Sequence, residues 1–276
     1  MTETRGRQSG SMLRAVRALA GAVLTPSGAA WARPTRRTGR IALVGLLAVG
    51  GAAAAYAASQ PASLPAGDKA AIEAVVRDYI LEHPEIVREA MVKLETKRVA
   101  SLVEANRSSL ETPYAGAWEG AAKPEVTLVA FMDYACGYCR ATVPTIARLL
   151  KEDPGLRVVY RELPIISEAS VPAARVSLLA AEAGRFPAFH AAMYAEDGVD
   201  NETILDAARK AGLDMEKVKA ELGNQTRNPA FAANIKLAQN LEAEGTPLLV
   251  VGDQVFYGAV SYETLKGAID KARKPG

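Results

Sequence analysis

The segment VTLVAFMDYACGYC, residues 126–139, decides the fold. Its first part, residues 126–131, is apolar or β-branched throughout, which is typical of a buried central strand. After the cysteine pair, apolar side chains recur at helical spacing up to a stop at Asp153-Pro154-Gly155, and residues 156–163 form the next predicted strand. Strand, helix and strand in this order predict a βαβ unit with parallel strands. The sequence therefore predicts an α/β fold with its cysteines where the first strand meets the helix.

The cysteine pair is the predicted reactive group. Cys136 and Cys139 are the only 2 cysteines in the 276 residues. At a helix N-terminus the first sulfur faces free backbone N–H groups and the positive end of the helix dipole, both of which favour a thiolate. We therefore expect Cys136 to attack, and Cys139, one helical turn deeper, to attack the resulting mixed disulfide. Such a pair needs no cofactor beyond its own reversible disulfide.

Other uses of a cysteine pair fit the sequence less well. A zinc site needs four ligands, and the chain has no second cysteine pair, while His83 and His190 lie about a hundred residues apart. We assign no metal ligand and expect both histidines to be structural, although transient binding of a soft ion such as Cu(I) stays open. A purely structural disulfide would close too short a loop to add much stability.

A second feature, Gly245-Thr246-Pro247, opens a predicted strand at 248–251 far along the chain. Proline cannot donate a ladder hydrogen bond, so its place at a strand start needs a reason. A cis Thr246–Pro247 bond would supply one, since it would leave the backbone of Thr246 unpaired beside the cysteines and free to bind a substrate strand. The residues alone leave cis and trans both open.

The N-terminal region predicts export. The first 40 residues hold 8 arginines against one acid, Glu3, and residues 41–58 then carry no charged side chain, about the length that crosses a bilayer. This order of charges places the N-terminus in the cytoplasm and the rest of the chain outside. A signal peptide cleaved near Ala57-Ala58, an uncleaved inner-membrane anchor and a buried helix of a cytosolic domain all stay open. The arginines are terminal and lack interleaved aromatics, so we expect no nucleic-acid binding.

Residues 68–111 predict two helices, broken at His83-Pro84, with Asp68 as the first N-cap. The second helix carries apolar residues on one side and charged residues on the other. Such a stripe must be buried, and both the catalytic domain and a second copy of the helix would serve.

The remaining elements and the segment boundaries are predicted from composition and periodicity. Residues 248–251 and 255–257 predict a hairpin, and residues 262–271 a closing helix. The predicted organisation is an Arg-rich, disordered cytoplasmic segment at 1–40, a signal or transmembrane helix at 41–58, a linker at 59–67, a helical extension at 68–111, a linker at 112–124 and a catalytic domain at 125–276 with a helical insertion at about 169–241.

Three motifs carry a resemblance to a known family: FMDYACGYC at 131–139, Gly245-Thr246-Pro247, and FYGAV at 256–260. Together they resemble the DsbA-like family of bacterial periplasmic oxidoreductases over about residues 124–271. The helices at 68–111 are similar to the N-terminal extension of Com1-like and ScsC-like members, some of which oligomerise through it. The resemblance implies a thioredoxin-like fold with an inserted helical domain, a cis-proline at Pro247, and Thr246 and Pro247 as supporting residues of the active site.

The chain departs from the family pattern at two places. Gly137 and Tyr138 stand between the cysteines where the strong oxidant DsbA has Pro-His, which predicts a less oxidising couple, and Gly-Tyr is similar to the dipeptide of the disulfide isomerase DsbC. Ala130 stands where thioredoxin and DsbA carry a buried acid. Asp133 is the nearest acid, and it either relays the proton of Cys139 or caps the turn.

These observations predict an exported thiol:disulfide oxidoreductase or isomerase. Its partners would be exported client proteins with cysteines, a membrane redox partner that resets the pair, and copies of itself bound through residues 68–111. It would work in the periplasm or another extracytoplasmic compartment, free or anchored. The alternatives are a monomeric DsbA-like oxidase and a copper- or thiol-binding chaperone module.

Overall fold

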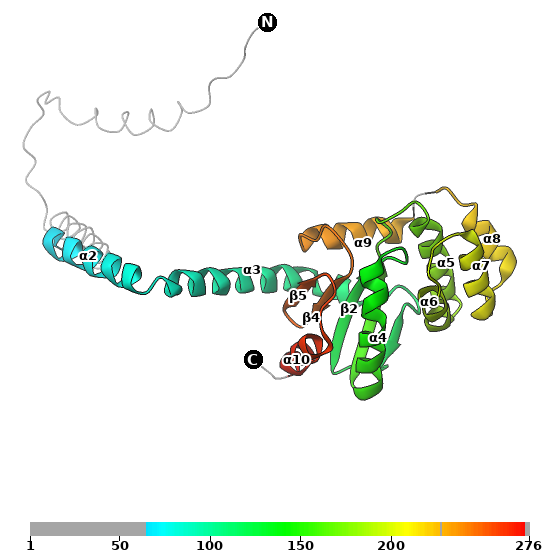
Figure 1. Cartoon of the computed structure of the whole chain (residues 1–276), viewed down its shortest axis with the longest axis horizontal. Coiled ribbons are helices and arrows are strands. Elements are labelled where there is room, and N and C mark those ends of the chain that lie inside the picture. Colours follow the sequence, from blue (N-terminus) through cyan, green and yellow to red (C-terminus); the bar gives the residue numbers. More distant parts are fainter. Residues whose placement is uncertain (1–64, 227, 274–276) are drawn as a thin grey trace, which may run out of the picture. The chain divides into compact units, whose positions relative to one another are not determined.

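A computed structural model of the chain describes residues 65–226 and 228–273. The predicted segments 1–40 and 41–58 and most of the linker at 59–67 lie outside the described residues. The chain divides between Val76 and Arg77 into two units. The described elements (Figure 1) are α2 (Ala66–Glu82), α3 (Glu85–Glu111), β1 (Trp118–Gly120), β2 (Val126–Met132), α4 (Gly137–Glu152), β3 (Leu156–Glu162), α5 (Ser170–Glu182), α6 (Phe186–Ala195), α7 (Asn201–Lys210), α8 (Met215–Leu222), α9 (Pro229–Asn240), β4 (Leu248–Val251), β5 (Gln254–Tyr257) and α10 (Tyr262–Ala272).

The described strands form one mixed sheet in the order β1-β3-β2-β4-β5. β2 and β3 run parallel and are connected by α4, so the predicted βαβ unit is present. β4 pairs antiparallel with β2 and with β5, which forms the predicted hairpin. Because Phe131 near the end of β2 lies opposite Leu248 at the start of β4, the residues just after β2 and just before β4 meet at one edge of the sheet.

The predicted linker at 112–124 is wrong in one respect, since it contains the edge strand β1. Trp118 pairs antiparallel with Val159 of β3, and Ala117 accepts a backbone hydrogen bond from Tyr160. β1 has 3 residues, too few to give a periodic pattern, and glycines and prolines surround it in the sequence. The segment is therefore part of the catalytic sheet.

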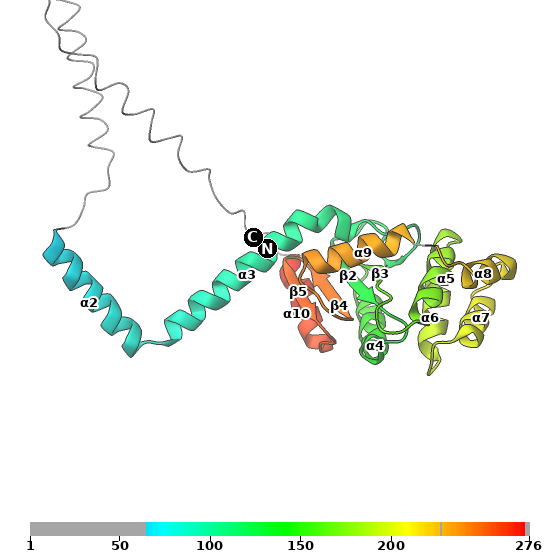
Figure 2. The ribbon, with the colours of Figure 1, turned by 90° about the horizontal axis from the view of Figure 1, so that it is seen from above.

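Alternate residues of β2 face the two helical layers that cover the sheet. Leu128, Ala130 and Met132 belong to the core beneath α4 and α10, whereas Val129 and Phe131 belong to the core beneath α3 and α9. This period of two is what a pleated strand imposes. Figure 2 shows α3 and α9 on one side of the sheet and α4 and α10 on the other.

Helices α5–α8 pack on one another beside the sheet and form the helical lobe. The predicted insertion at about 169–241 is therefore too long, because its last helix, α9, contacts α3 and β3 instead. Leu237 and Leu241 bury their side chains in the core that lies between the sheet and the helices α3 and α9. The chain thus leaves the sheet for the lobe after β3 and returns to it with α9.

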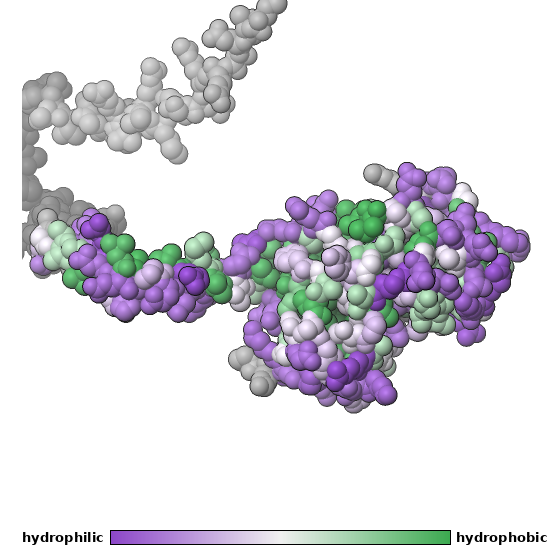
Figure 3. Space-filling model, viewed as in Figure 1, coloured by the Kyte–Doolittle hydropathy of each residue, from purple (hydrophilic) through white to green (hydrophobic). Residues whose placement is uncertain are grey.

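The two halves of α3 differ in burial. Val103 and Leu110 are 1% exposed and belong to the sheet core. Arg161 of β3, itself buried, donates to the carbonyls of Leu110 and Thr112 at 3.1 and 2.6 Å and so satisfies the C-terminal end of α3. The first half instead exposes a group of apolar side chains: Ile86, Val87, Met91, Val92 and Leu94. Figure 3 shows green, apolar atoms at the surface among the purple ones of the helices.

The described part of α2 corrects one detail. The helix begins at Ala66, so Asp68 lies in its first turn and is not the predicted N-cap. None of the helices within residues 65–226 and 228–273 combines the length and the apolar character that a membrane crossing requires. The predicted span at 41–58 is not among these residues.

Candidate functional site

Cys136 lies at the N-cap of α4, directly after β2. Its backbone is extended, with φ −86° and ψ 117°, and its Sγ accepts a hydrogen bond from the backbone N–H of Cys139 at 3.3 Å. Both cysteines are free thiols, and Cys136 is 6% exposed while Cys139 is fully buried. The first sulfur is thus the one that solvent and a client can reach.

Burial also controls the chemistry of Cys139. It raises the pKa of the Cys139 thiol strongly, and a backbone hydrogen bond from Asp133 and the nearby hydroxyl of Thr246 oppose the shift only in part. Cys139 therefore stays a thiol at neutral pH until its proton is removed during the reaction. This environment matches the predicted role of a second, resolving sulfur.

The Thr246–Pro247 peptide bond is cis, as the family resemblance predicted. The Cys136 thiol donates to the carbonyl oxygen of Thr246 at 3.3 Å, although 110 residues separate the two. Among the described residues the backbone N–H of Thr246 has no partner, and its buried Oγ1 has none either. The residues predicted to form one site therefore meet, with an unpaired backbone donor beside the reactive sulfur.

Asp133 lies between the strand and the cysteines and is 1% exposed. Its Oδ1 accepts from the N–H of Ala135 at 2.8 Å, and its Oδ2 accepts from the N–H groups of Ile165 and Ile166 at 2.8 and 2.9 Å. All these contacts are to backbone groups, and none joins the carboxylate to the Cys139 sulfur. These contacts fix the turn before Cys136 and the loop after β3.

The dipeptide between the cysteines faces outward. Tyr138 is 71% exposed, and a Cβ added at Gly137 would meet nothing within 4 Å. Ile165 and Ile166, held by Asp133, are 44% and 49% exposed. The active-site end of the sheet thus presents apolar side chains to solvent.

The sequence did not reveal a buried polar network next to this site. Glu162 accepts from Ser177 Oγ at 2.6 Å and lies 3.3 Å from the Tyr134 hydroxyl, which in turn lies 3.2 Å from His190 Nδ1. Burial raises the pKa of Glu162 to about 8 and lowers the pKa of His190 to about 3. Glu162 ends β3 opposite Met132. A buried acid is therefore present on β3, the parallel neighbour of the strand β2 that leads into the cysteines.

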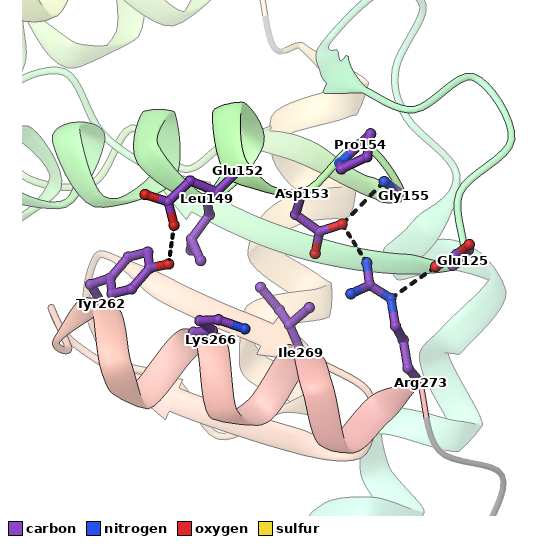
Figure 4. Close-up of a pocket in the computed structure, with 10 residues that line it drawn as sticks. All are labelled: Glu125, Leu149, Glu152, Asp153, Pro154, Gly155, Tyr262, Lys266, Ile269 and Arg273. Atoms are coloured by element: carbon purple, nitrogen blue, oxygen red, sulfur yellow. Dashed lines mark hydrogen bonds and ion pairs between the residues drawn. The ribbon is translucent and has the colours of Figure 1, made fainter.

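A pocket of about 310 Å³, shown in Figure 4, lies at the other end of α4. There Arg273 binds Asp153 at 2.5 Å and Glu125 at 3.0 Å, and Tyr262 donates to Glu152. The lining from α4 begins at Leu149, ten residues after Cys139, so at a rise of about 1.5 Å per residue it is about 15 Å along the helix from the cysteines. Its contacts join α10 to α4 and to the residue before β2. We therefore assign these residues to the packing of α10 and not to a binding site.

The sulfur pair is also the only candidate for holding a metal ion within the described residues, where no group of three or more His, Cys, Asp and Glu side chains converges. Two thiols could bind a soft monovalent ion in a two-coordinate fashion. His190 is buried in the aromatic cluster with Tyr134, Tyr160 and Phe186. Its environment is that of a core residue.

Comparison with known proteins gives two family matches. The DSBA-like thioredoxin domain matches residues 127–270, just over half of the chain. The N-terminal domain of the copper resistance protein ScsC matches residues 68–100. The two matches coincide with the catalytic region and with α2 and the first half of α3.

Solved structures agree with these matches. A thioredoxin-like oxidoreductase from Silicibacter pomeroyi is 40% identical, with a TM-score of 0.58, and the alignment covers 62% of this chain and 99% of that one. A periplasmic thioredoxin-like protein from Salmonella enterica is 28% identical over 60% and 95% of the two chains, with a TM-score of 0.54. A linker-deletion mutant of Proteus mirabilis ScsC is 28% identical over 77% and 98%, with a TM-score of 0.57.

The curated relatives are longer proteins. A Na(+)/H(+) antiporter NhaA 3 from Salinispora tropica is 27% identical over 156 residues, which are 55% of this chain and 24% of the antiporter. The chain thus spans about a quarter of the length of the curated relatives it matches, and their transport activity is not carried over to it. What the matches establish is the family: the chain belongs to the DsbA-like thioredoxin domain family of thiol–disulfide oxidoreductases, with Cys136 and Cys139 in the place of its redox pair.

Proposed function

We propose that the chain catalyses thiol–disulfide exchange on the cysteines of exported proteins, and that reshuffling of wrong disulfides is its main direction. The observation that carries the proposal is the position of Cys136, at the N-terminus of α4, 3.3 Å from the carbonyl of Thr246 and above the buried Cys139. The periplasmic Salmonella neighbour supports work outside the cytoplasm.

The reaction follows from the different burial of the two sulfurs. The Cys136 thiolate attacks a client disulfide, so that one client sulfur joins Cys136 and the other leaves as a thiolate. A second client thiolate can then attack the mixed disulfide, which rearranges the client and restores Cys136. Alternatively Cys139 loses its proton to the departing client thiolate and attacks Cys136, which leaves the chain oxidised and the client reduced by two electrons.

The residues around Cys136 support isomerisation over plain oxidation. Gly137 and Tyr138 replace the Pro-His of a strong oxidant, and no imidazole lies beside Cys136 to hold its thiolate. The exposed side chains of Tyr138, Ile165 and Ile166 support contact with unfolded clients. In this proposal Asp133 is a positioning residue that holds the loop of Ile165 and Ile166 against the active site.

Self-association belongs to the proposal. The exposed apolar residues of α3 between Ile86 and Leu94 lie within the region that matches the ScsC N-terminal domain. An oligomer would bring several Cys136 sulfurs around one client. A membrane redox partner would return the pair to the dithiol state.

Two refolding assays test the proposed direction. The full chain should recover active ribonuclease from its scrambled form in a glutathione buffer, and Cys136→Ser should abolish recovery. A chain that refolds reduced ribonuclease but leaves the scrambled form unchanged would instead be an oxidase. A measured reduction potential of the Cys136–Cys139 couple, titrated against glutathione, provides an independent criterion, since an isomerase requires a less oxidising couple than an oxidase.

A second function is favoured by the match to the N-terminal domain of a copper resistance protein. In that alternative the two sulfurs bind Cu(I) or protect client thiols without exchange. Replacing both cysteines by alanine separates the two functions. Cu(I) binding or protection of client thiols that the double substitution abolishes, with wild-type protein inactive on scrambled ribonuclease, would favour this alternative.

A further inference from the structure

A hollow of about 550 Å³ opens next to the client-binding backbone of Thr246. Its walls come from three parts of the fold: α3, the loop between α9 and β4, and the end of β5. We call it the Thr246 pocket, and it is lined by Glu95, Arg98, Glu242, Glu244, Gly245, Thr246, Tyr257 and Gly258.

The pocket continues directly from the reactive site. Thr246 accepts a hydrogen bond from the Cys136 thiol and also lines the hollow. The side chain of Thr246 is about nine-tenths buried, and its Oγ1, although near enough to the Cys139 sulfur to act on its pKa, has no partner at hydrogen-bond geometry among the described residues. A client strand that pairs with the free N–H of Thr246 therefore places the side chains next to its cysteine at this hollow.

The charges of the pocket favour a cation. Arg98 is held by Glu95, at 2.7 and 2.9 Å, and by Glu242. Glu244 is exposed and has no partner among the residues that the structure describes. The lining thus holds three carboxylates and one guanidinium, and the uncompensated charge is negative.

The remaining walls suit a long side chain. The Tyr257 ring is 54% exposed, and its hydroxyl is already engaged with the carbonyl of Leu241 at 2.8 Å, so the ring face is the surface it offers. Added Cβ atoms at Gly245 and Gly258 would meet nothing within 4 Å. A lysine or arginine stem can lie along an aromatic ring while its charged end reaches a carboxylate.

Glu242 supplies one of these carboxylates from a backbone position that favours glycine. It follows Leu241, the C-cap of α9, with φ +57°, a left-handed conformation that glycine adopts without strain at such helix ends. A glutamate there carries a conformational cost and supplies the carboxylate that binds Arg98.

We propose that the Thr246 pocket binds a lysine or arginine side chain within two residues of the client cysteine, so that the chain prefers basic clients. The inference rests on the proposed exchange reaction and names the class of substrate for it. Two residues of extended strand span about 7 Å, a distance that a lysine side chain can bridge.

A peptide series tests this preference. Peptides carry one cysteine as a mixed disulfide with nitrothiobenzoate and have Lys, Gln or Glu at the positions two residues before and after it. Reduced full-length chain oxidises its Cys136–Cys139 pair while the peptide thiol and the coloured thiolate are released. At low salt we expect the Lys peptide to react about tenfold faster than the Glu peptide, with Gln between them, and the ratio to fall towards one in 1 M NaCl.

Variants locate the effect. Glu242→Gln combined with Glu244→Gln should reduce the Lys-to-Glu ratio at least threefold, and Glu244→Gln alone should reduce it in part, without removing any intramolecular contact. Glu202→Gln, an exposed acid of α7 that does not line the Thr246 pocket, is the matched control and should keep the full ratio.

The outcomes separate this inference from the proposed function. Equal rates for the Lys and Glu peptides at low salt would overturn the pocket alone, since exchange itself would still occur. A preference that persists in the double variant would place its origin elsewhere and would also overturn it. If no peptide, including the Gln peptide, reacts with wild type faster than with Cys136→Ser, the proposed exchange function fails first.

Discussion

The two halves of α3 differ in burial although they form one helix. In the second half, Val103 and Leu110 pack into the sheet core, and Arg161 satisfies the helix end. In the first half, Met91 and Leu94 are 66% and 70% exposed. The comparison shows that the predicted extension at 68–111 is not a separate module, because its last turns complete the catalytic fold.

The same comparison divides the two alternatives for the apolar stripe. Packing on the catalytic domain is what the second half of α3 does. The first half has no such cover within the described residues, so it supports the proposed self-association. A truncated chain that begins at Pro124 would lack Val103, Leu110 and β1 together. Point substitutions are therefore better suited to separate the two halves of α3.

The largest expected effect is on the buried half. Leu110→Ala should lower the free energy of unfolding by about 2–5 kcal/mol, because it leaves a cavity in the core between the sheet and the helices α3 and α9. Leu94→Ala, the matched control on the exposed half, should change the stability of the catalytic unit by less than about 0.5 kcal/mol. Urea unfolding followed by tryptophan fluorescence measures both. Similar losses in the two variants would mean that both halves are equally buried in solution.

The buried region also predicts a pH dependence of stability near neutral and mildly alkaline pH. The pKa of Glu162 is raised by burial to about 8, above its ordinary value of 4.5, so the folded chain keeps a proton that the unfolded chain loses. The contribution of this group to stability is therefore complete below about pH 4.5 and is lost as the pH rises to about 8. Glu162→Gln should remove this decline of a few kcal/mol.

Urea midpoints at pH 5 and pH 8 provide the measurement. His190 acts in the opposite direction, since burial lowers its pKa from 6.5 to about 3, and its contribution is lost as the pH falls through that range. The comparison between pH 5 and pH 8 should therefore include His190→Gln. A wild-type decline that Glu162→Gln leaves intact would show that another group is responsible.

A smaller effect is expected on assembly. Met91→Asp combined with Leu94→Asp should shift the chain to monomer in sedimentation velocity, because the charges would be buried in the contact between copies. The free energy of unfolding of the catalytic unit should stay within about 0.5 kcal/mol. Lys93→Asp with Lys97→Asp, on exposed positions of the same helix, controls for added negative charge. A wild-type chain that sediments as a monomer at high concentration would contradict the proposed oligomer.

The smallest effect should come from the ion pairs where the two halves meet. Arg98, with a side chain 40% exposed, binds Glu95 and Glu242. Because solvent screens exposed pairs, Arg98→Ala should lower the urea midpoint only slightly, by much less than Leu110→Ala does. Arg98→Lys, which keeps the charge without the bidentate geometry, gives the matched comparison. A loss as large as that of Leu110→Ala would show that this contact holds α3 far more strongly than its exposure indicates.

Sequence patterns predicted the parts of the fold that depend on local periodicity. The run at 126–131, the helix after Cys139 and the hairpin at Gly252-Asp253 are all present. The cis bond before Pro247 needed the family resemblance, because residues that are distant in sequence determine it.

The missed features depend on contacts between distant segments. β1 is a strand only because β3 pairs with it, and α9 belongs to the sheet because α3 leaves a face open beside it. Glu162 could not be predicted from the strand that precedes the cysteines, which carries Ala130 at the expected position, because the acid comes from the parallel neighbouring strand β3. Neither pairing leaves a periodic signal in the sequence.

The hydrogen bond between the Cys136 thiol and the Thr246 carbonyl has a consequence for when a client can bind. A sulfur in a disulfide has no hydrogen to donate, so this carbonyl loses its partner whenever Cys136 is oxidised. While Cys136 is a protonated thiol it therefore occupies its own acceptor, and the disulfide form leaves this carbonyl vacant for a client backbone. Affinity for unfolded chains should differ between the two forms even though no helix or strand has to move.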